Sequence, residues 1–219
     1  MGQFEKFAEN WHNPSAEMSL LHQMNQLRIP YVLSFINKKM KGLDVGTGGG
    51  LVPLSLAKHD VLCDGIDIEQ KLIEVAQREA QQNSLSIKFI CSSVESYETS
   101  EQYDFITCFE MLEHVENPDF VVKKMMSWLK PGGLLFISTI NRTLAAYMAT
   151  IIVAEYILKW LPVSTHSYEK FITPQELQSY LEPSIPMDLR GIIYNPLEKS
   201  KFFLGSSLSV NYIGVWKIL

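Results

Sequence analysis

Leu43-Asp44-Val45-Gly46-Thr47-Gly48-Gly49-Gly50 is the stretch that decides the fold. It is an apolar strand end that carries an acidic residue, followed by a glycine turn whose backbone can close around a ligand. Dinucleotide-binding enzymes need a small third residue in G-x-G-x-x-G so that helix and strand can pack closely. Counted from Gly46 that position holds Leu51, and counted from Gly48 it holds Pro53. The sequence therefore lacks the cradle for a pyrophosphate, which argues against an NAD-dependent oxidoreductase.

The pattern that remains, D-x-G-x-G-x-G, favours a nucleoside with a cationic amine. Asp44 can bind the amine, and Gly46 and Gly48 let the chain pass close to the nucleoside. The next apolar segment ends at Asp67, about 20 residues after the glycines, where a carboxylate binds both ribose hydroxyls. Because S-adenosylmethionine (SAM) carries an ammonium group on a nucleoside, we predict SAM as the cofactor.

Length and charge restrict the class of protein. The chain has 219 residues and a net charge of −5, so we expect a single domain, 1–219, and no nucleic-acid partner, which would require clustered Lys and Arg. Residues 1–11 lack an apolar signal core, so no export signal is expected. The cysteines are odd in number and lie in or near apolar segments, which predicts reduced core thiols and a cytoplasmic location; they are Cys63, Cys91 and Cys108.

Strand candidates alternate with helical stretches along the chain, which predicts an α/β fold with a mostly parallel sheet and helices on both faces. The candidates are 43–46, 61–67, 86–91, 103–108, 134–140, 187–194 and 210–218. No long helix separates the last two, so we expect them to form an antiparallel pair at the sheet edge. Seven strands with an antiparallel last strand are the class I methyltransferase version of the Rossmann-like fold.

Local signals fix several boundaries. Asn117-Pro118-Asp119 and Thr173-Pro174-Gln175-Glu176 combine a cap, a first-turn proline and an acidic residue, and we expect a helix to begin at each. Lys130-Pro131-Gly132-Gly133 predicts a turn that leads into the strand at 134–140.

Three ionisable residues follow the fourth predicted strand, at the edge where open α/β sheets bind ligands. Glu110, Glu113 and His114 have helical spacing, so on a helical turn they would share one face. Such a trio suits Mg²⁺ moderately, and a solvated helix start is an equal alternative. A phenol acceptor must lose a proton before it can take a methyl group, and either Mg²⁺ or His114 could assist; the sequence leaves both open.

Residues 144–161 are apolar almost all round, with Glu155 and Lys159 as the only charges. A soluble surface helix would show a polar face. A helix of this length falls just short of the hydrocarbon core of about 30 Å, and its charges make spanning costly. The segment is either buried over the active site or lies in the membrane surface, and we favour the membrane surface.

The chain resembles a known family, the ubiquinone-biosynthesis O-methyltransferases, which are class I SAM-dependent enzymes. The most specific matches are Glu110-Met111-Leu112-Glu113-His114 and Ala154-Glu155-Tyr156-Ile157-Leu158. Further matching stretches, which extend over nearly the whole chain, are 21–28, 43–50, 103–109, 130–133, 138–142, 165–166 and 210–212.

The resemblance implies the roles of particular residues. Arg28, Gly46, Asp67 and Phe109 would contact SAM, with Arg28 gripping its carboxylate. Glu110, Glu113 and His114, the implied catalytic residues, match the positions where the family binds Mg²⁺. Thr47 and Phe109 depart from a frequent Cys and a frequent Met, which leaves this interpretation unchanged.

The resemblance also implies a reaction and its setting. The substrates would be the polyprenyl catechols 2-polyprenyl-6-hydroxyphenol and 3-demethylubiquinol. The chain would have an N-terminal helical cap at 1–40 and an apolar helical insertion at about 143–170. We expect association with the inner face of the membrane through 143–162, and contact with other ubiquinone-biosynthesis enzymes. The alternatives are O-methylation of another lipophilic phenol and a non-catalytic scaffold for lipid-borne quinone intermediates.

Overall fold

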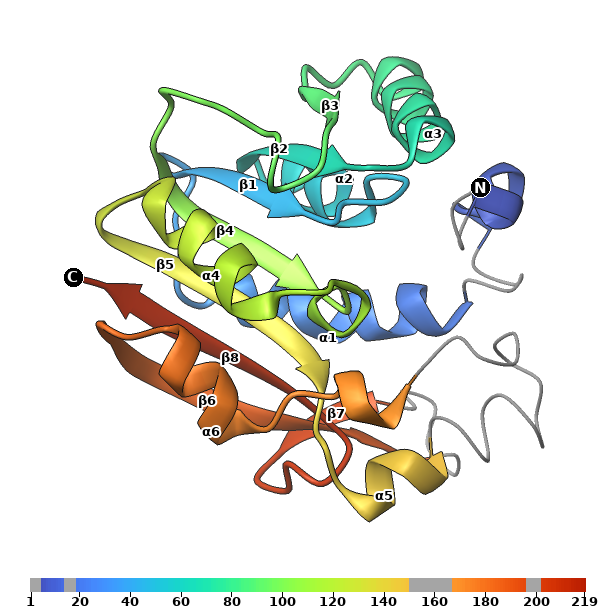
Figure 1. Ribbon diagram of the computed structural model, residues 1–219. Coiled ribbons are helices and arrows are strands. Elements are labelled where there is room, and N and C mark those ends of the chain that lie inside the picture. The colour runs from blue at the N-terminus through green and yellow to red at the C-terminus, as the bar shows by residue number, and fades with distance from the viewer. Residues whose placement is uncertain (1–4, 14–18, 150–166, 196–201) are drawn as a thin grey trace.

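A computed structural model describes residues 5–13, 19–149, 167–195 and 202–219 (Figure 1). Its centre is an eight-stranded mixed sheet in the order β3-β2-β1-β4-β5-β8-β6-β7. The strands are β1 (Lys41–Val45), β2 (Leu62–Asp67), β3 (Phe89–Cys91), β4 (Tyr103–Phe109), β5 (Leu129–Ile140), β6 (Ser184–Tyr194), β7 (Phe202–Gly205) and β8 (Asn211–Ile218). The described helices are η1 (Glu5–Asn10), α1 (Ser19–Leu33), α2 (Leu51–Ala57), α3 (Gln70–Gln82), η2 (Leu112–His114), α4 (Pro118–Ser127), α5 (Leu144–Ala146), η4 (Tyr168–Lys170) and α6 (Pro174–Tyr180).

The last strands differ from the prediction in number and position. Strands β1 to β5 pair in parallel, and β8 pairs antiparallel with both β5 and β6. The antiparallel pair of β6 and β8 is confirmed. The predicted seven strands and the edge position of the last strand were wrong, because β7 adds an eighth strand at the edge and β8 inserts between β5 and β6.

Helices cover both faces of the sheet (Figure 1), as predicted. Alternation along β5 shows how the strand serves both layers. Leu134 and Phe136 pack in the core cluster that contains α1 and α2, whereas Leu135 and Ile137 pack in the cluster that contains α4 and α6. Since successive strand side chains point to opposite faces, a nearly continuous apolar run is what a strand buried on both sides requires.

The predicted helix starts are confirmed. The Asn117 side chain accepts a hydrogen bond from the Phe120 backbone N–H, and Thr173 forms a capping box with Glu176. The turn predicted at 130–133 is instead part of β5, where the pairing with β4 shifts register. Gly132 has φ +81°, which allows these extra residues to bulge out of the ladder.

The cysteines are free thiols, as predicted, but they are not all in the core. Cys63 and Cys108 are buried, whereas Cys91 is exposed at the end of β3. The prediction of a core position was therefore wrong for Cys91, because β3 is an edge strand only three residues long.

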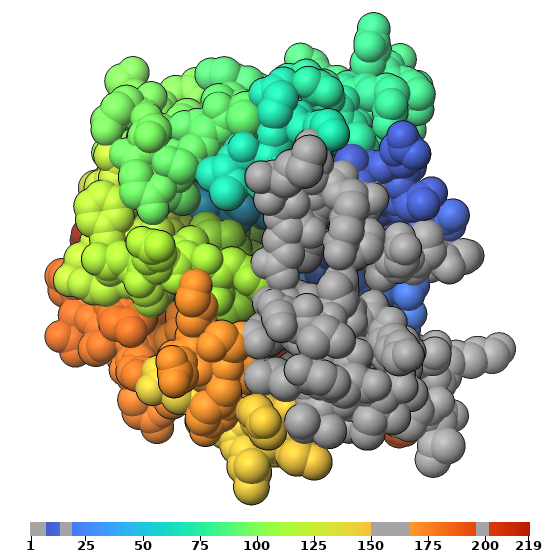
Figure 2. Space-filling model, turned by 45° about the vertical axis from the view of Figure 1, so that its right-hand side comes forward, coloured from blue at the N-terminus to red at the C-terminus, as the bar shows by residue number. Residues whose placement is uncertain are grey.

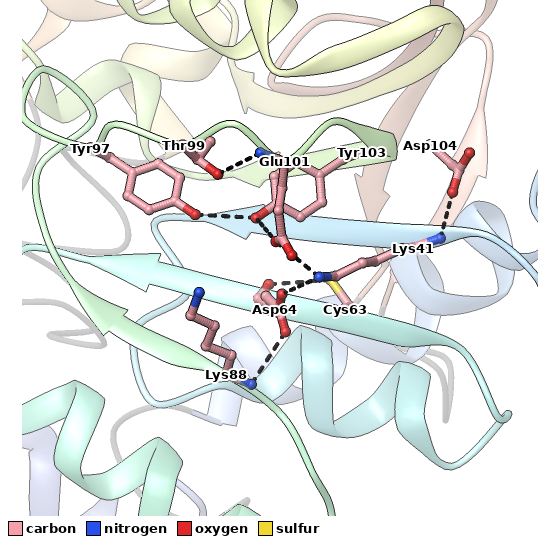
Figure 3. Close-up of polar contacts among 9 residues, drawn as sticks. All are labelled: Lys41, Cys63, Asp64, Lys88, Tyr97, Thr99, Glu101, Tyr103 and Asp104. Carbon is pink, nitrogen blue, oxygen red and sulfur yellow. Dashed lines mark hydrogen bonds and ion pairs between the residues drawn. The ribbon is translucent and has the colours of Figure 1, made fainter.

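A polar cluster joins the amino ends of β1, β2 and β4 (Figure 3). Lys41 Nζ contacts Asp64 Oδ2 at 3.1 Å and Glu101 Oε2 at 2.9 Å. The Tyr103 hydroxyl donates to the same Glu101 oxygen at 3.2 Å, and the Lys41 backbone N–H donates to Asp104 Oδ2 at 2.8 Å. Lys41 thus compensates a nearly buried carboxylate on β2 at the edge opposite the glycine turn.

The apolar insertion begins at α5, and residues 150–166 lie outside the described part of the chain. Among the described residues, no helix is long and apolar enough to cross a membrane. Leu144 and Met148, at the start of the insertion, are 74% and 47% exposed.

We expect Lys41→Met to lower the free energy of unfolding by about 1 kcal/mol, because Asp64 loses its compensating cation while Lys41 itself is partly solvated. Urea unfolding would measure this loss. Lys38→Met is the matched control, since Lys38 and its partner Asp60 are 69% and 74% exposed and their pair should contribute almost nothing. Lys41 lowers the pKa of Glu101, so the difference from wild type should shrink as the pH falls below about 4. Equal losses in the two variants would contradict this role of Lys41.

Candidate active site

The predicted site residues gather at the carboxyl ends of β1, β2 and β4 (Figure 1). These strands are neighbours in the sheet and run parallel, so their ends meet at one edge. The glycine turn leaves β1 here and leads directly into α2, which begins at Leu51. Ligands bind at such an edge, where the strand order reverses between β1 and β4.

The glycine turn is held to Asp67, the second acidic landmark of the sequence. Gly46 and Gly48 have φ of +75° and +53°, a region that disfavours residues with a side chain. The Gly48 N–H donates to Asp67 Oδ2 at 2.8 Å, and the Glu69 N–H donates to Oδ1 at 2.9 Å. Burial raises the pKa of Asp67 despite these donors. The glycine turn and the end of β2 are therefore joined through the Asp67 carboxylate.

Asp44 lies under the turn and is 3% exposed. Thr107 on the neighbouring strand β4 donates its hydroxyl proton to Asp44 Oδ1 at 2.6 Å. Burial raises the pKa of Asp44 to about 7, and the Thr107 hydrogen bond opposes part of that rise. An anion in this position is poorly compensated and would gain from a cationic ligand.

Arg28 reaches the same edge from α1 and is 2% exposed. Its Nη2 donates to Glu110 Oε1 at 2.5 Å and to the Met24 sulfur at 3.7 Å. Its guanidinium lies 5.3 Å from the centroid of the Phe109 ring. Burial lowers the pKa of Arg28, and the charges of Glu110, Glu113 and Asp44 oppose this. Phe109 thus packs against Arg28.

Glu110 directly follows β4 and has a left-handed conformation, with φ +51°. Ser138 on β5 donates to Glu110 Oε1 at 3.0 Å, and the Asn211 amide on β8 donates to Oε2 at 3.0 Å. With Arg28, these donors occupy both carboxylate oxygens. Three elements therefore converge on one side chain.

Glu113 is buried in η2 at 3% exposure. Its Oε2 accepts a hydrogen bond from Thr139 at 2.7 Å. Burial and the nearby Glu110 charge raise the pKa of Glu113. Among the described residues, neither Glu113 Oε1 nor Arg28 Nε has a hydrogen-bond partner. A buried unpaired acceptor and a buried unpaired donor at one site are the pattern expected where a polar ligand supplies the partners.

The expectation that Glu110, Glu113 and His114 share a helical face was wrong. Glu110 belongs to the strand end, and the 3₁₀ helix η2 contains only Leu112 to His114. A left-handed residue between strand and helix breaks the helical spacing. His114 ends η2 half-buried, with its backbone N–H donating to Met111 O.

The same residues do not fit Mg²⁺ in this arrangement. Within the described ranges, no three His, Cys, Asp or Glu side chains are grouped so that they could hold a metal ion. Both Glu110 oxygens already accept from protein donors, and Mg²⁺ requires oxygen ligands in nearly octahedral geometry. A metal at this position is therefore not supported.

A family model described as a methyltransferase domain matches residues 19–183. The ubiquinone biosynthesis O-methyltransferase of Coxiella burnetii (strain RSA 331 / Henzerling II) is 42% identical, over 97% of this chain and 92% of that protein. The protein of the same name from Actinobacillus pleuropneumoniae serotype 5b (strain L20) is 40% identical, over 99% of this chain and 97% of that protein. The chain belongs to the ubiquinone biosynthesis O-methyltransferase family.

Solved structures agree on the fold of this O-methyltransferase family member. Magnesium protoporphyrin IX methyltransferase from Synechocystis PCC 6803, solved with S-adenosylhomocysteine (SAH), has a TM-score of 0.70 and 16% identity, with 99% of this chain and 94% of that chain covered. A possible histamine N-methyltransferase from Thermotoga maritima has a TM-score of 0.70 and 14% identity, with 99% and 98% covered. Together with the family model and the relatives, this fold confirms the predicted class I, SAM-dependent methyltransferase.

Sequence reasoning missed several residues of the methyltransferase site. Thr107, Ser138 and Asn211 are short polar residues inside apolar strands, and only their strand-end positions could have indicated them. The ring of Trp11, which precedes α1, packs so closely on the glycine turn that a Cβ at Gly49 would come within 2.2 Å of it.

Histidines hold this N-terminal contact. His12 Nε2 lies 2.7 Å from Gly49 O, and His22 Nε2 lies 2.8 Å from Trp11 O. These two contacts fix Trp11 and the residues around it near the site. Figure 2 shows the N-terminal residues in blue beside α3 on the same face of the molecule.

We expect Asp44→Asn to stabilise the cofactor-free methyltransferase more at about pH 8 than at about pH 5. In the folded protein Asp44 keeps its proton up to a pKa of about 7, whereas in the unfolded chain it loses the proton above about 3.8. The contribution of Asp44 to the free energy of unfolding is therefore full below pH 3.8 and is lost as the pH rises toward 7. Asn cannot ionise and still accepts from Thr107, so the gain at high pH has an upper bound of about 4 kcal/mol. Thermal unfolding at both pH values would measure it. A variant with the same stability difference from wild type at both pH values would contradict the burial of a charged Asp44.

Proposed function

We propose that this methyltransferase transfers the SAM methyl group to a hydroxyl of polyprenyl catechol intermediates of ubiquinone, namely 2-polyprenyl-6-hydroxyphenol and 3-demethylubiquinol. The relatives at 42% and 40% identity over nearly the full chain are ubiquinone biosynthesis O-methyltransferases, which supports the substrate class. In the reaction, the sulfonium C–S bond breaks, an O–C bond forms, and the hydroxyl proton passes to a base. The products are a methyl ether, SAH and a proton.

The surplus of buried carboxyl groups is the observation that carries the proposal. Three carboxyl groups act on Arg28 at this edge, those of Asp44, Glu110 and Glu113. Among the described residues, Arg28 is the only buried cation beside them. Burial raises the pKa of Asp44 and of Glu113. SAM carries a sulfonium, an ammonium and a carboxylate, so its net positive charge suits this site, and its carboxylate suits the unpaired Arg28 Nε–H.

We assign the remaining cofactor contacts by the same chemistry. Asp44 would bind the ammonium, and Asp67 would bind the ribose hydroxyls through lone pairs that its two backbone donors leave available. Gly46 and Gly48 would let the backbone approach the nucleoside. Phe109 would contribute an apolar wall in addition to its contact with Arg28.

Removal of the acceptor proton is the chemical difficulty. A phenol with a pKa of about 10 is about one part in a thousand ionised at pH 7, which adds about 4 kcal/mol to the barrier. We propose His114 as the base, since a neutral imidazole can take the proton at neutral pH. Its position at the end of η2, next to Glu113, supports this assignment.

Magnesium is the other source of help that the family resemblance implies, through Glu110, Glu113 and His114. When bound, Mg²⁺ would stabilise a developing phenolate. Because the arrangement of these residues offers the ion no ligand set, we derive no step through it.

We also propose that the insertion at 143–162 contacts the membrane surface and gives access to lipid-borne substrates. It begins beyond the carboxyl end of β5, at the same edge as the site. The exposed Leu144 and Met148 at its start favour contact with lipid over solvent. Figure 2 shows the residues of α5 in yellow at the border of the molecule, where they are open to contact.

We expect His114→Asn to lower kcat by a factor of about 10²–10⁴ while the Kd for SAM stays unchanged. The assay would follow methyl transfer from SAM to a short-chain demethylubiquinol, with and without chelator. Conversion of this acceptor by the wild type tests the proposed function itself, and wild-type protein that binds SAH but leaves the acceptor unmethylated would contradict it. Unchanged kcat in the variant would remove His114 as the base.

We expect Leu144→Ser to reduce flotation with phospholipid vesicles several-fold, because an exposed apolar side chain would no longer enter the lipid. Leu62→Ser is the matched control: Leu62 is 60% exposed but begins β2 at the opposite edge of the sheet. Since the net charge is −5, vesicles with and without anionic lipid should bind similarly. Equal flotation of both variants would argue against this surface.

A further inference from the structure

We propose that Ser138 and Asn211 are positioning residues that hold the Glu110 carboxylate, and that Glu110 in turn fixes the Arg28 guanidinium for the cofactor carboxylate. Glu110 then serves SAM binding and not metal binding. This inference rests on the proposed role of Arg28, and it assigns a function to two residues that the sequence did not indicate.

Three protein donors hold the Glu110 carboxylate. Oε1 accepts from Arg28 at 2.5 Å and from Ser138 at 3.0 Å, and Oε2 accepts from Asn211 at 3.0 Å. The Glu110 side chain is only 16% exposed. A metal ion would have to share these oxygens with their protein donors, and any buried donor that it displaced would lose its partner.

The backbone also fixes Glu110. Its N–H donates to Ser138 O at 3.0 Å, and its φ of +51° is uncommon for a residue with a side chain. Such a conformation persists where the surroundings determine it strongly. Ser138 therefore holds both the backbone and the carboxylate of Glu110.

Strand topology explains how Asn211 reaches this site. Because β8 runs antiparallel to β5, its first residue lies at the edge where β5 ends, and Asn211 pairs with Ile140. A parallel last strand would begin at the opposite edge. The insertion of β8 between β5 and β6 thus delivers an amide donor to the carboxyl edge.

Arg28 needs such support because its guanidinium ends a long side chain that begins on α1. Among its described contacts, Glu110 is the only carboxylate within hydrogen-bond distance, and the Phe109 ring supports the guanidinium plane. With Nη2 bound to Glu110, the Nε–H stays unpaired and buried. A fixed guanidinium with a free donor can bind a carboxylate with little loss of conformational entropy.

The test compares two ligands that differ in the amino-acid part. SAH has the carboxylate and the ammonium, and 5′-methylthioadenosine has the same nucleoside and sulfur without either. We expect Asn211→Leu and Glu110→Gln each to weaken SAH binding about tenfold by calorimetry and to leave 5′-methylthioadenosine binding unchanged. A merely structural defect would weaken both ligands. The double variant should lose no more than about the larger single effect, because both changes act through Arg28.

Asn141→Leu is the matched control. Asn141 lies at the same edge, but its amide donates to the Leu208 carbonyl and not to Glu110. We expect this variant to leave the ratio of the two affinities unchanged. If Asn211→Leu does not fold, Asn211→Asp has the same shape and places a second carboxylate against Glu110, and it should show the same selective loss of SAH.

The outcomes separate the inference from the proposed function. Equal effects on the two ligands, or an unchanged SAH affinity with a changed Mg²⁺ concentration for half-maximal activity, would overturn the positioning role. Wild-type protein that binds neither ligand would overturn the proposed cofactor site itself. Wild-type binding combined with a selective loss of SAH in the variants would support both.

Discussion

The burial of one guanidinium among three carboxyl groups is the constraint on which the site depends. Arg28 is 2% exposed and interacts with the charges of Glu110, Glu113 and Asp44. Buried charges are tolerated when they are paired and hydrogen-bonded, and here the pairing is incomplete. The carboxyl groups respond with raised pKa values, and one donor and one acceptor have no partner among the described residues. The fold therefore holds together a charge distribution that a zwitterionic, cationic ligand would complete.

The two edges of the sheet treat charge differently. At the amino edge, Lys41 lies between Asp64 and Glu101 and is itself 37% exposed, so water and a counter-charge satisfy the carboxylates (Figure 3). At the carboxyl edge, Asp44 is nearly inaccessible to water, and the Thr107 hydroxyl and the charge of Arg28 compensate it only in part. The first arrangement stabilises the register of the strands, whereas the second leaves free energy to be gained by binding.

Signals with a short range in sequence predicted most of the fold. Caps at Asn117 and Thr173 and the alternation of apolar segments gave the helix starts and the parallel sheet, because these depend on residues a few positions apart. The insertion of β8 was missed, since strand order depends on packing across the whole sheet. For the site, Asp44 and Asp67 were recognisable beside the glycines. Arg28 resembled a surface cation because its partner Glu110 is 82 positions away, and no spacing rule joins an α1 side chain to a strand end.

The charge of the site also bears on how a methyl transferase cycle would proceed. SAM carries a net positive charge, and methyl transfer removes its sulfonium, so the SAH that remains is neutral overall. A surplus of carboxyl groups around Arg28 therefore favours the substrate over the product. For unit charges about 6–8 Å apart at an effective dielectric constant of about 20, the difference is about 2–3 kcal/mol. Screening reduces this difference, and so does protonation of Asp44 and Glu113, whose pKa values are raised by burial. With SAM bound as proposed, the incomplete pairing that would strengthen its binding would also weaken the hold on SAH once the methyl group has left.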